Sequence, residues 1–127
     1  MTKIAIIGLG EMGASIAAVL SQNVNHEVTG VDSDTKAVDF ALKTGIITKK
    51  ASNIEQIASQ MDVIILATPV NIISQLIVQL SHLTLKKRVI ITDTGSTKRE
   101  IMALAEKLLT PQNITFIGGH AMAGTHK

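Results

Sequence analysis

The 127-residue sequence contains no cysteine, tryptophan or tyrosine, and only two phenylalanines and two prolines. Without cysteine, neither a disulfide framework nor a thiolate metal site is possible, and we expect no bound metal. With only two aromatic side chains there is no platform on which bases could stack, so we expect no nucleic-acid partner. These absences direct attention to small-molecule chemistry.

A strong net charge and long apolar runs are also absent. The net charge is +2, and the densest basic cluster, Lys86–Arg88, is expected to be a solvated turn. No apolar run approaches the roughly 20 residues of a membrane helix, so we expect no membrane partner. The N-terminus enters a strand-like run at once and leaves no room for a signal peptide, which predicts a cytoplasmic location.

Short runs rich in valine and isoleucine alternate five times with helix-like stretches. The strand-like runs are Ile4–Ile7, Glu27–Val31, Val63–Ala67, Val89–Thr92 and Thr115–Ile117. The helix-like stretches are Met12–Gln22, Thr35–Lys43, Ile54–Gln60, Asn71–Ser81 and Lys98–Leu109. Continuous apolar strands between helices are typical of a parallel sheet covered on both faces. The sequence therefore predicts a single α/β domain with a doubly wound, mainly parallel sheet, the Rossmann fold.

A G-x-G-x-x-G pattern joins the first strand-like run to the first helix-like stretch. Gly8 permits a sharp exit from the strand, Gly10 lets the backbone approach phosphates, and Gly13 lets the helix pack closely. Such a turn opens the helix that receives a dinucleotide pyrophosphate. We expect the cofactor to lie against Gly8, Gly10, Glu11, Met12 and Gly13. A plain glycine-rich turn is the alternative.

Asp32 ends the second strand-like run, 19 residues after Gly13. A carboxylate at this point can accept hydrogen bonds from the adenosine ribose hydroxyls and would repel a 2′-phosphate. The sequence therefore predicts NAD as the cofactor in preference to NADP. Asp34 is expected to cap the helix that follows.

Two further loops follow strand-like runs and should reach the same edge of the sheet. Thr68 and Pro69 follow the third run, where we expect contact with the cofactor, although a plain strand-to-helix turn is the alternative. Thr94 and Ser96 follow the fourth run. Thr94 is a further candidate for cofactor binding, and Ser96 is a candidate catalytic hydroxyl, with helix N-capping as its alternative.

His120 follows the last strand-like run and two glycines. An imidazole has a pKa near neutrality, so it suits proton transfer beside a hydride-accepting nicotinamide. We therefore expect His120 to take a proton from a substrate hydroxyl and Ser96 to orient the ring. A loop histidine without a task is the alternative. His26, His82 and His126 are interpreted as structural or incidental.

Three motifs resemble the N-terminal, cofactor-binding part of the prephenate/arogenate dehydrogenase family. They are Gly8–Ser15 (GLGEMGAS), Asp93–Lys98 (DTGSTK) and Gly118–Gly124 (GGHAMAG). The resemblance implies NAD-dependent oxidative decarboxylation of prephenate, or of its amino analogue arogenate, in tyrosine biosynthesis. It also implies that His120 deprotonates the ring hydroxyl and that Ser96 positions it. Ala121 and Thr97 depart from the family, which commonly has proline and valine there.

Family members continue into a helical C-terminal domain that forms a homodimer and supplies a cation for the substrate carboxylates. We therefore expect this chain to be a fragment that binds cofactor weakly and does not turn over alone. Two other functions remain open. One is a β-hydroxyacid-type dehydrogenase, which shares the glycine pattern but lacks the G-G-H segment. The other is a non-catalytic module that senses NAD.

Overall fold

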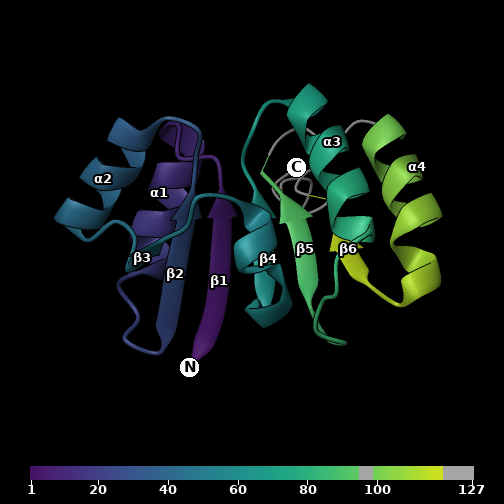
Figure 1. Ribbon diagram of the computed structural model, residues 1–127, viewed down its shortest axis with the longest axis horizontal. Helices are drawn as coiled ribbons and strands as arrows, with labels where there is room; N and C mark the ends of the chain where they lie inside the picture. The colour runs from purple at the N-terminus through teal and green to yellow at the C-terminus, as the bar shows by residue number, and fades with distance from the viewer. Residues whose placement is uncertain (95–98, 119–127) are drawn as a thin grey trace, which may run out of the picture.

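The computed structural model describes residues 1–94 and 99–118, and shows a six-stranded parallel sheet with helices on both faces (Figure 1). The strands are β1 (Thr2–Ile7), β2 (His26–Val31), β3 (Lys49–Lys50), β4 (Val63–Leu66), β5 (Ile90–Asp93) and β6 (Thr115–Ile117). Their order is β3-β2-β1-β4-β5-β6. The predicted doubly wound parallel fold is confirmed. The chain reverses its direction of winding between β1 and β4, which creates the switch point where open sheets bind ligands.

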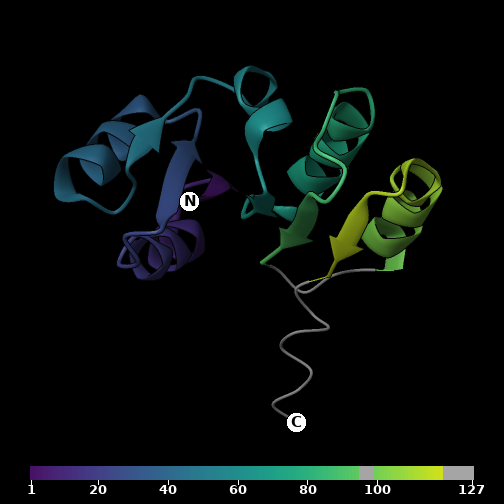
Figure 2. The ribbon, with the colours of Figure 1, turned by 90° about the horizontal axis from the view of Figure 1, so that it is seen from below.

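The helices are α1 (Glu11–Leu20), α2 (Thr35–Thr44), α3 (Val70–Ser81) and α4 (Arg99–Leu108). Alternate side chains of β1 enter two separate cores. Ile4 and Ile6 pack with buried residues of α1 and α2, whereas Ala5 and Ile7 pack with those of α3 and α4. Figure 2 shows α1 and α3 on opposite sides of the sheet. Strands buried on both faces explain why the sequence shows continuous apolar runs there.

Local signals set the ends of α2 and α3. The Asp34 carboxylate caps α2, as predicted, by accepting from the N–H groups of Lys36 at 3.0 Å and Ala37 at 3.3 Å. Gly45 ends α2 in the left-handed conformation, with φ +81°. Pro69 lies immediately before α3 and accepts hydrogen bonds from its first turn, where its missing N–H costs nothing.

Two predictions about elements were wrong. The stretch from 54 to 60 forms two short 3₁₀ turns, Ile54–Gln56 and Ala58–Gln60, instead of one helix. Seven residues are too few for a stable isolated α-helix, and Ile57 between the turns leaves helical geometry at φ −124°. The prediction of five strands also missed β3, because its two exposed lysines lack the apolar pattern of a strand. Lysines are typical of a short strand at a sheet edge.

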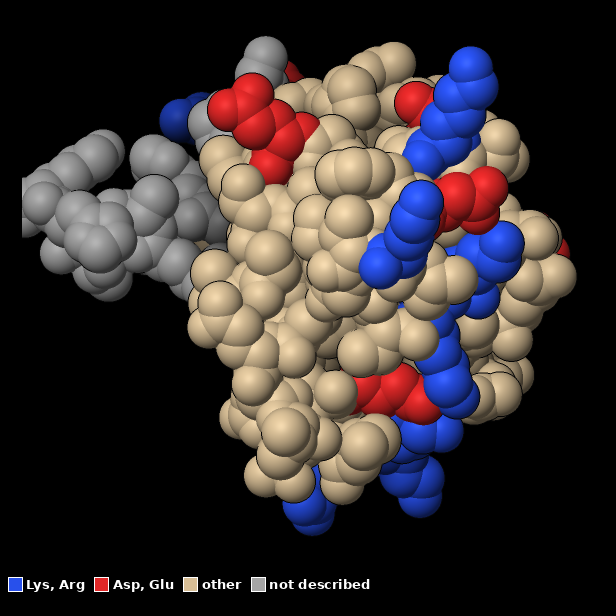
Figure 3. All heavy atoms as spheres, turned by 90° about the vertical axis from the view of Figure 1, so that its left-hand side faces the viewer, with Lys and Arg blue, Asp and Glu red and all other residues tan. Residues whose placement is uncertain are grey.

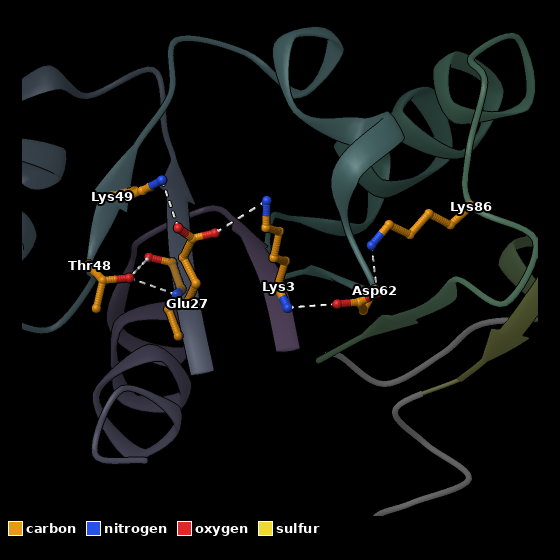
Figure 4. A network of polar contacts seen from close by, with 7 residues as sticks. Lys3, Glu27, Thr48, Lys49, Asp62 and Lys86 are labelled. Atoms are coloured by element: carbon orange, nitrogen blue, oxygen red, sulfur yellow. Dashed lines mark hydrogen bonds and ion pairs between the residues drawn. The ribbon is translucent and has the colours of Figure 1, made fainter. Parts of the chain in front are cut away.

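Charged residues tie the strands together at the amino ends of β1, β2 and β4 (Figure 4). Glu27 lies 2.7 Å from Lys49 Nζ and 3.9 Å from Lys3 Nζ. Asp62 accepts from the Lys3 N–H at 2.8 Å and from Lys86 Nζ at 2.9 Å. The hydrogen bond from Lys49 lowers the pKa of Glu27, and the Lys3 N–H, followed by Lys86, lowers the pKa of Asp62. Both carboxylates are therefore held in their charged form.

The helices are short. Within residues 1–94 and 99–118, no helix combines the length and the hydropathy that crossing a bilayer requires.

Candidate cofactor-binding site

The turn after β1 is built on two glycines that the fold requires. Gly8 has φ +102°, and a Cβ there would come 2.8 Å from the carbonyl oxygen of Ala67. A Cβ on Gly13 would come within 1.9 Å of the Gly8 carbonyl oxygen. Both positions therefore exclude a side chain, because neighbouring backbone already fills the space. The close packing of α1 on the turn fixes where the helix begins.

Gly10 differs from the other two glycines because the protein leaves space around it. A Cβ built there would meet no protein atom within 4 Å among the described residues. Gly10 is the N-cap of α1, and no side chain in the described part of the chain caps the helix there. The first hydrogen bond of the helix runs from the Ala14 N–H to the Gly10 oxygen at 2.9 Å. The N–H groups of Glu11, Met12 and Gly13 precede that bond, so the helix start can receive an anion.

Asp32 links the end of β2 to the glycine turn. Its Oδ2 accepts from the Leu9 N–H at 2.6 Å, and its Oδ1 accepts from the Asp34 N–H at 2.8 Å. A carboxylate offers about four lone-pair positions, so each oxygen can still accept from a ligand hydroxyl. The carboxylate is thus held beside the glycine turn by the backbone. The bond to Leu9 spans 23 residues and was not predicted from the sequence pattern.

Thr68 and Thr94 follow the two strands on the other side of the switch point. The Thr68 hydroxyl is buried and has no hydrogen-bond partner among the described residues. Thr94 is half-buried and donates its N–H to the Leu66 carbonyl at 3.1 Å. A buried hydroxyl without a partner is costly. Thr68 therefore offers a group that a polar ligand would satisfy.

Two hollows meet at Asp32 and Ser33. The first, of about 520 Å³, has a mainly apolar lining that includes Ile7, Val31, Ala67, Pro69, Ile72 and Leu76. The second, the polar hollow of about 510 Å³, is lined mostly by polar residues, which include Thr35, Asp39, Lys50, Ser52 and Gln56, together with Val38 and Ala51. Apart from Pro69, the sequence interpretation did not single out these lining residues. The four-residue spacing of Ile72 and Leu76 could have placed both on one face of α3.

The two candidate catalytic residues, Ser96 and His120, lie outside the described residues. The strands that lead toward them are described: β5 ends at Asp93 and β6 ends at Ile117, and the two strands pair in parallel. Their carboxyl ends lie at the same edge of the sheet as the turn after β1. The roles of Ser96 and His120 therefore stay predictions from the sequence.

The strand order and the arrangement of the site define the class of this domain. A parallel sheet of order 3-2-1-4-5-6, a glycine turn before an uncapped helix and an acid at the end of β2 are the features of a dinucleotide-binding domain. The chain belongs to the family described as "Prephenate dehydrogenase, nucleotide-binding domain", whose family model matches residues 16–127. The match begins after the glycine turn, so the turn is an independent observation.

Two curated relatives of this chain are named prephenate dehydrogenase. It is 42% identical over 128 residues to a prephenate dehydrogenase of Lactococcus lactis, covering 100% of this chain and 36% of that protein. It is 37% identical over 126 residues to one of Bacillus subtilis, covering 98% of this chain and 33% of that protein. The chain thus spans about a third of the length of these curated relatives.

A solved structure with a similar fold is the prephenate dehydrogenase of A. aeolicus in complex with hydroxyphenyl propionate and NAD⁺. The TM-score is 0.83 at 29% identity, and the match covers 100% of this chain and 44% of the other.

Proposed function

We propose that this domain binds NAD at the edge of the sheet formed by the turn after β1. The observation that carries the proposal is the 2.6 Å bond from the Leu9 N–H to Asp32 Oδ2, which holds the carboxylate beside the glycine turn. An acid at this position would bind the ribose next to a pyrophosphate on the turn. The NAD⁺ in the A. aeolicus relative supports the same assignment.

The residues present fit this cofactor. The space above Gly10 leaves room for a pyrophosphate to approach the backbone, and the N–H groups of Glu11, Met12 and Gly13 would bind it. Asp32 would accept from the adenosine ribose hydroxyls, and the apolar hollow suits an adenine ring.

On the other side of the switch point, three residues complete the proposed contacts. The Thr68 hydroxyl, which has no partner among the described residues, would gain a hydrogen bond. Pro69 and Thr94 would add further contacts to the cofactor. When bound, the nicotinamide accepts a hydride.

For the parent protein we propose the oxidative decarboxylation of prephenate to 4-hydroxyphenylpyruvate, a step of tyrosine biosynthesis. His120 accepts the proton of the ring hydroxyl while the carbon that bears it loses a hydride. The ring carboxylate leaves as carbon dioxide, and the electron pair of the broken C–C bond completes the aromatic ring. The phenolate oxygen then takes back a proton to give the hydroxyl of the product. Ser96 positions His120 or the hydroxyl. Arogenate, the amino analogue, would undergo the same ring chemistry, and the family resemblance supports both substrates.

The proposal extends to the rest of the parent protein. It includes a helical C-terminal domain that forms a homodimer and binds the substrate carboxylates, and a cytoplasmic location. The family resemblance supports these points, and the chain's coverage of about a third of its curated relatives leaves length for such a domain.

The test is a turnover assay of the full-length parent protein with NAD and either prephenate, arogenate or 3-hydroxyisobutyrate. We expect turnover of prephenate or arogenate, and a fall in kcat of about 10²–10⁴ for His120→Asn, the range for a lost general base. His82→Asn, an exposed histidine at the end of α3, is the matched control and should keep full activity. Equal kcat for His120→Asn and the unaltered enzyme would contradict the role of His120. Turnover of 3-hydroxyisobutyrate alone would contradict the substrate.

A further inference from the structure

The polar hollow lies beyond the position that the proposed function gives to the ribose. Asp32 and Ser33 border both hollows, with the apolar one on the side of β4 and α3 and the polar one on the side of α2 and β3. If adenine fills the apolar hollow and Asp32 binds the ribose hydroxyls, the polar hollow is the space that a substituent on the ribose would enter. A 2′-phosphate is the substituent that distinguishes NADP from NAD.

The lining of this hollow includes a lysine that already forms an ion pair with an aspartate. Lys50, at the end of β3, has its Nζ 3.0 Å from Oδ1 of Asp39 in the middle of α2. Both side chains are more than half exposed. Lys50 and Asp39, with Asp32, are the charged residues among the described ones that line the hollow, so its net charge is −1. Figure 3 looks onto the side where α2 lies, and there lysines and acidic side chains lie next to one another.

We propose that Asp39 is a second determinant of cofactor choice, acting through Lys50. A lysine at this place could bind the 2′-phosphate of NADP as a point charge. Because Asp39 holds the ammonium group and cancels its charge, the lining as described offers a 2′-phosphate no free cation. The charge of Asp32 would repel the 2′-phosphate directly. Asp39 would disfavour it indirectly, because it holds Lys50 in an ion pair. The inference rests on the proposed binding of NAD.

The ion pair between Asp39 and Lys50 can be removed by substitution because it lies on the surface. An exposed ion pair contributes little to stability, and asparagine at position 39 keeps the shape of the side chain on an exposed face of α2. Asp39→Asn therefore frees Lys50 while leaving the domain folded. The net charge of the lining then changes from −1 to 0, and the lysine can reorient toward a ligand.

The experiment measures the Kd of NAD and of NADP by calorimetry for the 127-residue chain and its variants. We expect Asp39→Asn to tighten NADP binding about five- to tenfold, the effect of one unit charge at a screened distance. NAD has no 2′-phosphate, so its Kd should change less than about twofold. The gain for NADP should shrink at high salt, since it is electrostatic.

Two further variants separate the ion pair from a general loss of negative charge. Asp39→Asn with Lys50→Gln should lose the gain, because the freed cation is gone. Glu106→Gln, on the exposed face of α4, removes a negative charge elsewhere and should leave both Kd values unchanged. An unchanged NADP Kd in Asp39→Asn, with NAD still bound, would overturn the role of Asp39 alone. Absence of NAD binding by the unaltered chain would overturn the proposed function and this inference together.

Discussion

Gly10 and Gly13 lie three residues apart in the same turn but meet opposite surroundings. At Gly13 the backbone of Gly8 fills the space of a side chain, whereas at Gly10 no atom of the residues that the structure describes does so. Gly10 therefore leaves room for a ligand, whereas Gly13 is required by the packing of the fold itself. The sequence pattern alone assigns both roles in general terms, and the coordinates show which role each residue has.

Gly13→Ala should therefore destabilise the domain by about 3 kcal/mol or more, because the Gly8 carbonyl must move to admit the new methyl group. Gly10→Ala is the matched control and should change the unfolding free energy by less than about 1 kcal/mol. Urea unfolding followed by circular dichroism measures both. Equal stabilities for the two variants would contradict the packing described for α1.

At the level of elements, the apolar runs predicted five of the six strands, because strands buried on both faces must be apolar throughout. They could not reveal β3, because its two exposed lysines lack the apolar pattern of a buried strand. Because β3 was not predicted, Lys50, which lines the polar hollow from β3, was not identified as part of the site either. The acid at the end of β2 was predictable from its position. Its bond to Leu9 was not, because a contact across 23 residues leaves no local pattern.

The charged residues at the opposite end of these strands make stability depend on pH. The folded-state pKa of Glu27 lies below its ordinary value, so the unfolded chain binds more protons once the pH falls to about 4.3. Its contribution is therefore present above that pH and is lost as the pH falls through the lowered pKa. Glu27→Gln should flatten the rise of unfolding free energy between about pH 3 and 5. At pH 7 it should cost less than about 1 kcal/mol.

Unfolding in urea at a series of pH values measures this slope. Glu106→Gln, remote from the lysines at that edge, serves as the control and should keep the slope of the unaltered chain. A slope as steep in Glu27→Gln as in the unaltered chain would show that the pair with Lys49 does not hold the carboxylate in its charged form.

Taken as a whole, the molecule has two distinct ends. The amino ends of its central strands carry the ion pairs that involve Lys3, Glu27 and Asp62, whereas the carboxyl ends carry the glycine turn, Asp32 and the two hollows. Parallel strands place all their carboxyl ends at one edge, so one topological rule assembles residues that are far apart in the sequence. The resemblance to prephenate dehydrogenases is consistent with that division.

The most direct test of the central claim, that the start of α1 holds the pyrophosphate of NAD, is calorimetric titration of the 127-residue chain and its Gly10→Ala variant with NAD. The new methyl group fills only the space that the protein leaves open. We predict one NAD per unaltered chain and an affinity at least about tenfold weaker in Gly10→Ala, with the unfolding free energy preserved. Equal affinities in two equally stable chains would contradict the claim.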